Sequence, residues 1–271
     1  MTLVDVGRGA PLVLIPGVQA RWEWMRDTVR ALSSRFRVLT CSLAGEPGSG
    51  HPFDPALGFD NFLIQIDRVL DEAGEQDAVL CGVSYGGLIA LRYAARRPQR
   101  VRALVLVSVP PPDYEPDARI RRYLRAPRLM APVFCVGAIA RGWREMRSGL
   151  PTWRARATFA LRQALTVTGA PMRPSYMRQR VELLRGVDFT DDARRCEAPT
   201  LLVTGDPDLD RVVRVESTLR YNTLIPHARC ARMAGTGHLG PVLRPEEFTS
   251  RISAFVDDVA EPREPRRCRV V

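Results

Sequence analysis

The stretch from 78 to 87, Ala-Val-Leu-Cys-Gly-Val-Ser-Tyr-Gly-Gly, constrains the fold of this chain more than any other. It begins as an apolar run typical of a buried strand and continues into an Ala- and Leu-rich segment typical of a helix. Between the two, Gly82 and Gly86 flank Ser84 and leave room for a sharp turn. A serine on such a turn can meet a base and backbone N–H groups that stabilise an oxyanion. The context therefore predicts that Ser84 is a nucleophile rather than an ordinary turn residue.

Two later segments offer an acid and a base. The apolar run at 200–204 predicts a strand, and Gly-Asp-Pro-Asp-Leu-Asp follows it at 205–210. Of the three histidines, His238 is the best placed, because it follows another strand-like run and the turn Gly-Thr-Gly. An Asp after a strand is most often a solvated turn residue or a helix N-cap. The combination favours catalysis, since an activated serine needs a base and the base needs an orienting acid.

The order Ser84, Asp208, His238 is the chain order of triads in α/β-hydrolases. From about Leu3 to Val256 the chain resembles α/β-hydrolase-fold serine hydrolases with a helical cap. The resemblance implies that Ser84 attacks a carbonyl, His238 takes and returns the proton, and Asp208 orients the imidazole. Asp206 and Asp210 are neighbouring acids, but Asp208 has the family's spacing from the glycine that ends the strand.

The oxyanion hole of this fold needs two backbone donors. The resemblance assigns them to the N–H groups of Tyr85 and Val18, the latter in the loop that follows the early strand at 11–15. The chain departs from many relatives by having Pro16-Gly17 in place of His-Gly, and Val83 where His is frequent. The stretch 42–49 also lacks the usual Asp-x-x-Gly-x-Gly-x-Ser pattern, so the subfamily is not identified.

Strand-like and helical segments alternate, which predicts a mostly parallel, doubly wound sheet with helices on both faces. This rhythm stops for about 85 residues of helical pattern, where the family inserts its cap. We expect an α/β-hydrolase core at 1–110 and 199–260, a helical cap insertion at 111–198 and a disordered tail at 261–271.

All 40 basic residues are arginine, and their excess lies in one segment. Residues 118–187 hold many arginines and only two acids, Glu145 and Glu182. Three interpretations stay open: a solvated basic face, attraction of an anionic substrate such as a carboxylate or an acyl thioester of an acidic carrier, and contact with a membrane surface or nucleic acid. Nucleic acid ranks last, because no recognition module accompanies the charge.

The six cysteines are scattered, which argues against a zinc site or a disulfide framework, and Cys41, Cys81 and Cys230 lie in strand-like runs as small buried hydrophobes. We expect no metal and no cofactor. No apolar run approaches the ~20 residues of a membrane span, and the N-terminus does not resemble a signal peptide, which favours the cytoplasm. The oligomeric state is not predicted.

The function predicted from the sequence is a cofactor-independent serine hydrolase that cleaves a small or medium ester, lactone or related acyl substrate through an acyl-enzyme. C–C bond hydrolysis and acyl transfer use the same three residues and stay open as alternatives. A hydrolase-like protein that binds a ligand with little turnover is the alternative from a different functional class.

Overall fold

The computed structural model describes residues 2–261, apart from the side chains of residues 134, 135 and 139. One seven-stranded sheet forms its centre, with the order β1-β3-β2-β4-β5-β6-β7. The β1–β3 pair is antiparallel and every other neighbouring pair is parallel. The strands are β1 (Val4–Val6), β2 (Ala10–Ile15), β3 (Phe36–Thr40), β4 (Ala78–Val83), β5 (Val101–Val107), β6 (Thr200–Thr204) and β7 (Arg229–Arg232). This is the α/β-hydrolase arrangement that the sequence predicts.

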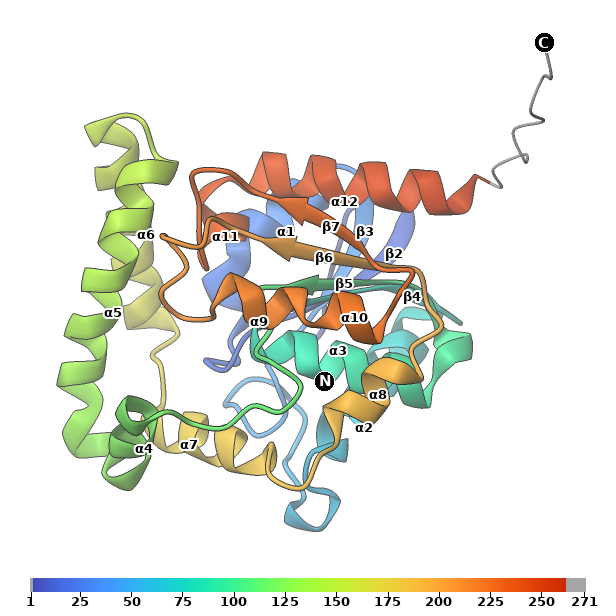
Figure 1. Ribbon diagram of the computed structural model, residues 1–271, viewed down its shortest axis with the longest axis horizontal. Coiled ribbons are helices and arrows are strands. Elements are labelled where there is room, and N and C mark those ends of the chain that lie inside the picture. Colours follow the sequence, from blue (N-terminus) through green and yellow to red (C-terminus); the bar gives the residue numbers. More distant parts are fainter. Residues whose placement is uncertain (1, 262–271) are drawn as a thin grey trace.

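Helices cover both faces of the sheet because alternate strand residues point to opposite sides. In β4, Val79 and Cys81 join the apolar cluster under α1 and α12, whereas Leu80 joins the cluster under α2, α3 and α8. Figure 1 shows α1 and α12 on one side of the strands and α2, α3 and α8 on the other. The helical segments of the core are η1 (Trp22–Met25), α1 (Arg26–Leu32), η2 (Pro55–Leu57), α2 (Asp60–Ala73), α3 (Tyr85–Arg96), η3 (Pro98–Arg100), α9 (Val215–Leu219), α10 (Tyr221–Leu224), α11 (Gly240–Leu243) and α12 (Pro245–Ala260).

Five helices lie between β5 and β6 in the chain. They are α4 (Ala118–Arg125), α5 (Pro127–Gly149), α6 (Trp153–Gly169), α7 (Pro174–Leu183) and α8 (Phe189–Arg194). The first four extend beyond the end of the sheet towards which the arrowheads of β5, β6 and β7 point (Figure 1), while α8 packs on α3. We therefore keep 111–198 as the proposed cap insertion, with α8 as its return to the core. Most of the predicted tail, 262–271, lies outside the described residues.

The prediction that Cys230 is a buried hydrophobe is wrong. Cys41 and Cys81 are buried, but Cys230 is exposed. It lies on β7, which is the last strand of the sheet and has two neighbouring arginines, Arg229 and Arg232, that are exposed as well. An edge strand with solvent on one face does not need apolar side chains on both of its faces.

Candidate active site

Ser84 occupies the sharp turn between β4 and α3. Its φ of +55° is a conformation that residues with a side chain rarely adopt. A methyl group at Gly82 would lie 2.3 Å from the carbonyl oxygen of Gly86, and one at Gly86 would lie 2.3 Å from that of Ile15. The two glycines of the pentapeptide are therefore required by close backbone contacts, as the motif predicts. The helix begins directly after the serine, at Tyr85.

Backbone strain is concentrated near this turn. Within residues 2–261, the non-glycine residues with positive φ are Ala20, Ser84 and Ser108. Each follows one of three adjacent strands, β2, β4 and β5. Strained residues persist only where their surroundings hold them, and they gather at functional sites. The strain marks the carboxyl ends of these central strands as the candidate site.

The loop at 16–19 lies against the serine turn. A methyl group at Gly86 would come within 2.6 Å of the Pro16 carbonyl oxygen, and the loop closes through a hydrogen bond from Ala20 N to Gly17 O of 2.8 Å. The N–H groups of Val18 and Tyr85 donate no hydrogen bond within residues 2–261. Tyr85 N is at the N-terminus of α3, where the helix dipole favours negative charge. Both predicted oxyanion donors are thus unengaged.

His238 faces Asp210, and not Asp208. The imidazole Nδ1 lies 3.4 Å from Asp210 Oδ2, and the Asp210 side chain is 1% exposed. Asp208 is exposed, and its backbone oxygen accepts a hydrogen bond from Arg211. The structure therefore places Asp210 beside the imidazole where the sequence analysis expects Asp208, and Asp210 takes that place in the candidate site.

The conformation of the loop after β6 explains this correction. The carbonyl oxygen of Asp206 accepts hydrogen bonds from the N–H groups of Leu209 and Asp210, so the chain makes a helical turn there. The turn directs position 208 outward and position 210 inward. Asp210 Oδ1 then caps the N–H groups of Val212 and Val213 at 3.0 and 2.8 Å, leaving Oδ2 for the histidine.

Two glycines bring the acid loop and the base loop together. A methyl group at Gly205 would lie 2.4 Å from Thr236 O, and one at Gly237 would lie 2.6 Å from the carbonyl carbon of Leu209. Any side chain at either position would push the loops apart. Gly205 and Gly237 therefore allow the close backbone contacts beside the Asp–His pair, as Gly82 and Gly86 do beside Ser84.

The two charged groups shift each other's ionisation. Burial acts to raise the pKa of Asp210, but its contacts with His238 and with two N–H groups outweigh burial and lower that pKa. Burial likewise acts to lower the pKa of His238, but Asp210 and Glu145 outweigh it and raise that pKa. This arrangement stabilises an imidazolium, the form that a general base reaches after taking a proton.

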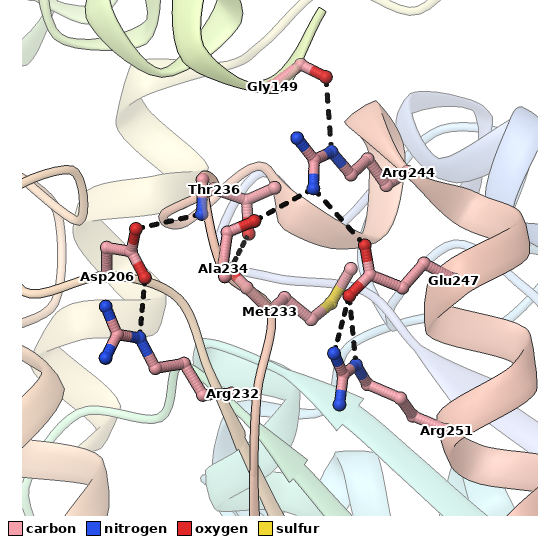
Figure 2. A network of polar contacts seen from close by, with 10 residues as sticks. Gly149, Asp206, Arg232, Met233, Ala234, Thr236, Arg244, Glu247 and Arg251 are labelled. Carbon is pink, nitrogen blue, oxygen red and sulfur yellow. Dashed lines mark hydrogen bonds and ion pairs between the residues drawn. The ribbon is translucent and has the colours of Figure 1, made fainter.

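A polar network holds the segment before His238 (Figure 2). Asp206 accepts hydrogen bonds from Arg232 at 2.7 Å and from the N–H of Gly235 at 2.8 Å. Arg244 donates to Ala234 O at 2.9 Å and to Gly149 O, the end of the cap helix α5, at 3.2 Å. The base loop is therefore anchored both to the acid loop and to the cap.

Arg180, on the cap helix α7, reaches the opposite side of the site. It donates to Val18 O at 3.1 Å and to Glu46 at 2.6 Å, and its own carbonyl oxygen accepts from the Tyr85 hydroxyl at 3.1 Å. The Arg180 and Glu46 side chains are 4% and 1% exposed. The cap thus holds the loop that carries one predicted oxyanion donor, Val18, and contacts Tyr85, which carries the other.

Replacing Arg180 with methionine should destabilise the protein by about 3 kcal/mol, because the Glu46 carboxylate would remain buried without its partner. The control is Arg178→Met, which breaks the exposed pair of Arg178 with Glu182 and should cost at most about 1 kcal/mol. Urea unfolding of both variants measures the difference. Equal losses of unfolding free energy in the two variants would show that the buried Arg180–Glu46 pair stabilises the protein no more than the exposed pair does.

Sequence reasoning missed Asp210 as the partner of His238, and it missed Glu145 and Arg180 entirely. Glu145 is 2% exposed and accepts hydrogen bonds on both sides of His238. A signal for Glu145 was present in the sequence, because it is one of only two acids in the arginine-rich stretch 118–187. Arg180 had no signal, since nothing local separates it from the other arginines of the segment.

The model of the alpha/beta hydrolase family matches residues 12–251 of this chain. The chain belongs to this family. Its topology, its serine turn and its Asp–His pair after β6 and β7 agree with that membership.

Curated relatives extend over nearly the whole chain. Polyketide synthase ThaQ of Burkholderia thailandensis is 32% identical over 270 residues, which cover 93% of this chain but only 12% of the synthase. The 2-hydroxy-6-oxo-2,4-heptadienoate hydrolase of Pseudomonas putida is 29% identical, covering 94% of this chain and 91% of the relative. Among solved structures, the enol-lactonase from Burkholderia xenovorans LB400 superposes with a TM-score of 0.75 at 18% identity, covering 94% of this chain and 95% of that one. At this low identity, the similarity to the enol-lactonase shows only that the two chains share a fold.

Among the described residues, no group of three or more His, Cys, Asp or Glu side chains is placed to hold a metal ion. Within residues 2–261, no helix has the length and apolar character to cross a bilayer. A cavity of about 1000 Å³ opens between α6, α1 and α12, with Asp27 and Arg162 among its lining residues. Its lining includes none of the candidate site residues.

Proposed function

We propose that this protein is a serine hydrolase that cleaves an ester, lactone or related acyl bond without a cofactor. The observation that carries the proposal is the strained Ser84 at the N-terminus of α3, with the buried Asp210–His238 pair on neighbouring loops. A serine, an imidazole and a carboxylate in this chain order are the constellation that acyl transfer requires.

In the proposed reaction, Ser84 Oγ attacks the substrate carbonyl carbon while His238 takes its proton. The N–H groups of Val18 and Tyr85 stabilise the oxyanion, and Asp210 stabilises the imidazolium. Collapse of the tetrahedral intermediate expels the alcohol, which receives the proton from His238. Water, deprotonated by the same imidazole, then releases the acid and restores Ser84.

Within residues 2–261 no hydrogen bond joins Ser84 to His238, although the sheet places both at its carboxyl edge. Ser84 N bonds to the end of β5, Ser108 N to the end of β6, and Asp206 N to Thr236 O beside the base. Catalytic hydrogen bonds are often long before substrate binds. The proposal therefore requires this contact in the substrate complex.

A substrate panel tests the proposal. Purified protein is offered p-nitrophenyl esters of increasing chain length, simple lactones and acyl thioesters, and hydrolysis is followed in parallel with the Ser84→Ala variant. The proposal expects Ser84-dependent turnover of at least one ester or lactone. Saturable binding of these compounds without turnover would support the ligand-binding alternative and contradict the proposal.

Hydrolysis of a C–C bond is the second candidate. The relative from Pseudomonas putida is named for a keto acid that contains no ester, so its hydrolysis breaks a carbon–carbon bond. The same panel therefore includes a vinylogous keto acid of this type. Turnover of that compound with all esters inert would replace the first proposal with the second.

The proposed acyl substrate is anionic. The cap carries exposed arginines, among them Arg121, Arg122, Arg125, Arg128, Arg144 and Arg147, and the relative from Pseudomonas putida is named for a carboxylate. A surface of one charge sign raises the local concentration of oppositely charged substrates. Thioesters of an acidic carrier would present the same negative charge to the cap.

Added salt should lower kcat/KM for an anionic ester more than it lowers kcat/KM for the neutral analogue of that ester. Raising the ionic strength from roughly 0.02 M to roughly 0.5 M shortens the screening length to a few ångströms. We expect kcat/KM for an ester with a free carboxylate to fall by roughly tenfold, with little change for the matching methyl-capped ester. Equal changes for both esters would contradict an anionic substrate.

A further inference from the structure

Glu145 is a buried acid in an arginine-rich cap, but its hydrogen bonds go to the base loop. It lies on α5 and is 2% exposed. Its Oε1 accepts hydrogen bonds of 2.6 Å each from the N–H groups of Gly237 and Leu239. These are the residues directly before and after His238. One carboxylate oxygen of the cap therefore fixes the backbone on both sides of the proposed base.

The second oxygen of Glu145 accepts no hydrogen bond within residues 2–261. The pKa of Glu145 is raised to about 7, chiefly by burial and to a smaller extent by Asp210, while the two N–H groups and His238 act in the opposite direction. In return, the charge of Glu145 helps to raise the pKa of His238. Two carboxylates, Asp210 from the core and Glu145 from the cap, thus influence one imidazole.

Several charged groups on the elements that pack against α5 have partners of their own. On α4, Arg119 and Tyr123 interact with Arg141, and Arg180 on α7 pairs with Glu46. Arg244, directly after α11, contacts Gly149 O, Ala234 O and Glu247. The charged groups that act on Glu145 are therefore His238 and Asp210.

We propose that Glu145 is a positioning residue that couples the cap to the base, because it holds the His238 loop and, together with Asp210, faces the positive charge that the imidazole gains during the reaction. This inference rests on the proposed role of His238 as the general base. It predicts that the cap contributes to catalysis through Glu145 as well as by covering the site.

Two substitutions separate the two effects of Glu145. Glu145→Gln keeps one carbonyl oxygen to accept both N–H groups but removes the negative charge. Glu145→Ala removes the oxygen and the charge together. Glu182→Gln is the matched control, since Glu182 is the other acid of residues 118–187 and pairs with Arg178 on the surface.

The experiment measures the rate at which a fluorophosphonate labels Ser84 in each variant, from about pH 5.5 to about pH 9. Loss of the Glu145 charge removes one of the two groups that raise the pKa of His238, so the acid limb of the Glu145→Gln profile should move to lower pH. Its plateau at high pH should stay near that of the parent. Glu145→Ala should lower the plateau by about tenfold or more, because the loop loses its anchor. Glu182→Gln should match the parent.

An NMR titration of the His238 imidazole in the parent and in Glu145→Gln gives a second readout that does not depend on labelling. An unchanged imidazole pKa would overturn the inference, even in a protein that fails to label. Equal losses of labelling and melting temperature in both Glu145 variants, with no movement of the acid limb, would also overturn it, because they indicate only a structural role. If the fluorophosphonate does not label Ser84 of the parent protein, that result contradicts the proposed function instead.

Discussion

Ser84→Ala is expected to lower kcat/KM for the best ester substrate by about 10⁴-fold or more. Alanine has no oxygen to attack the carbonyl, whereas the β4–α3 turn, its glycines and the N-terminus of α3 remain. Alanine keeps the Cβ that serine has at position 84, so the backbone strain at this φ is unchanged and folding should be unaffected. Initial rates and a melting curve on the same preparation measure both expectations.

Ser108→Ala is the matched control for this variant. Ser108 is also buried, also has a positive φ, and follows the adjacent strand β5. It differs in that Val109 and Pro110 follow it, without a helix whose N-terminus could stabilise an oxyanion. We expect this variant to retain most of the activity. A Ser108 variant that loses activity while the Ser84 variant retains it would contradict the assignment of the nucleophile.

Asp210→Asn is expected to lower kcat by about 10³- to 10⁴-fold near neutral pH, because an amide does not hold the imidazole in the tautomer that accepts the serine proton. The amide oxygen can still cap the N–H groups of Val212 and Val213, so the loop should keep its conformation. Loss of the carboxylate also removes the larger of the two influences that raise the pKa of His238, so the remaining activity should persist to lower pH.

Asp208→Asn is the matched control, because Asp208 is the same residue type and lies only two positions from Asp210 on the same turn. Asp208 is exposed, so its substitution should change kcat by less than about twofold. Steady-state kinetics of the two variants distinguish the acids. Inactivity of the Asp208 variant together with full activity of the Asp210 variant would favour the original prediction from spacing.

The serine turn could be predicted because its determinants are local. A buried strand, two glycines that sterics require and a helix that starts at Tyr85 all lie within a few residues of Ser84. The alternation of strands and helices likewise predicts the parallel sheet. Cys230 shows where such reasoning ends, since its exposure depends on β7 being the last strand, and strand order is not a local property.

The sequence could place the acidic partner of His238 in the loop at 205–210, but it could not identify which aspartate of that loop it is. Spacing from Gly205 favours Asp208, but the hydrogen bonds from Leu209 and Asp210 to Asp206 O wind the chain into a turn that reverses which side chains point inward. Glu145 and Arg180 depend on contacts between residues that are more than 90 positions apart in the chain, such as those from Glu145 to Gly237 and Leu239. Such contacts follow from the packing of the cap on the core, which a single sequence does not encode in any short pattern.

The central claim, that Ser84 is an activated nucleophile, is tested most directly by intact-mass spectrometry after treatment with a fluorophosphonate. The parent protein and the Ser84→Ala variant are treated side by side, and the modified peptide is mapped. We predict a single adduct on the parent, located on Ser84, and none on the variant. An adduct on both proteins, or on neither, would contradict the account.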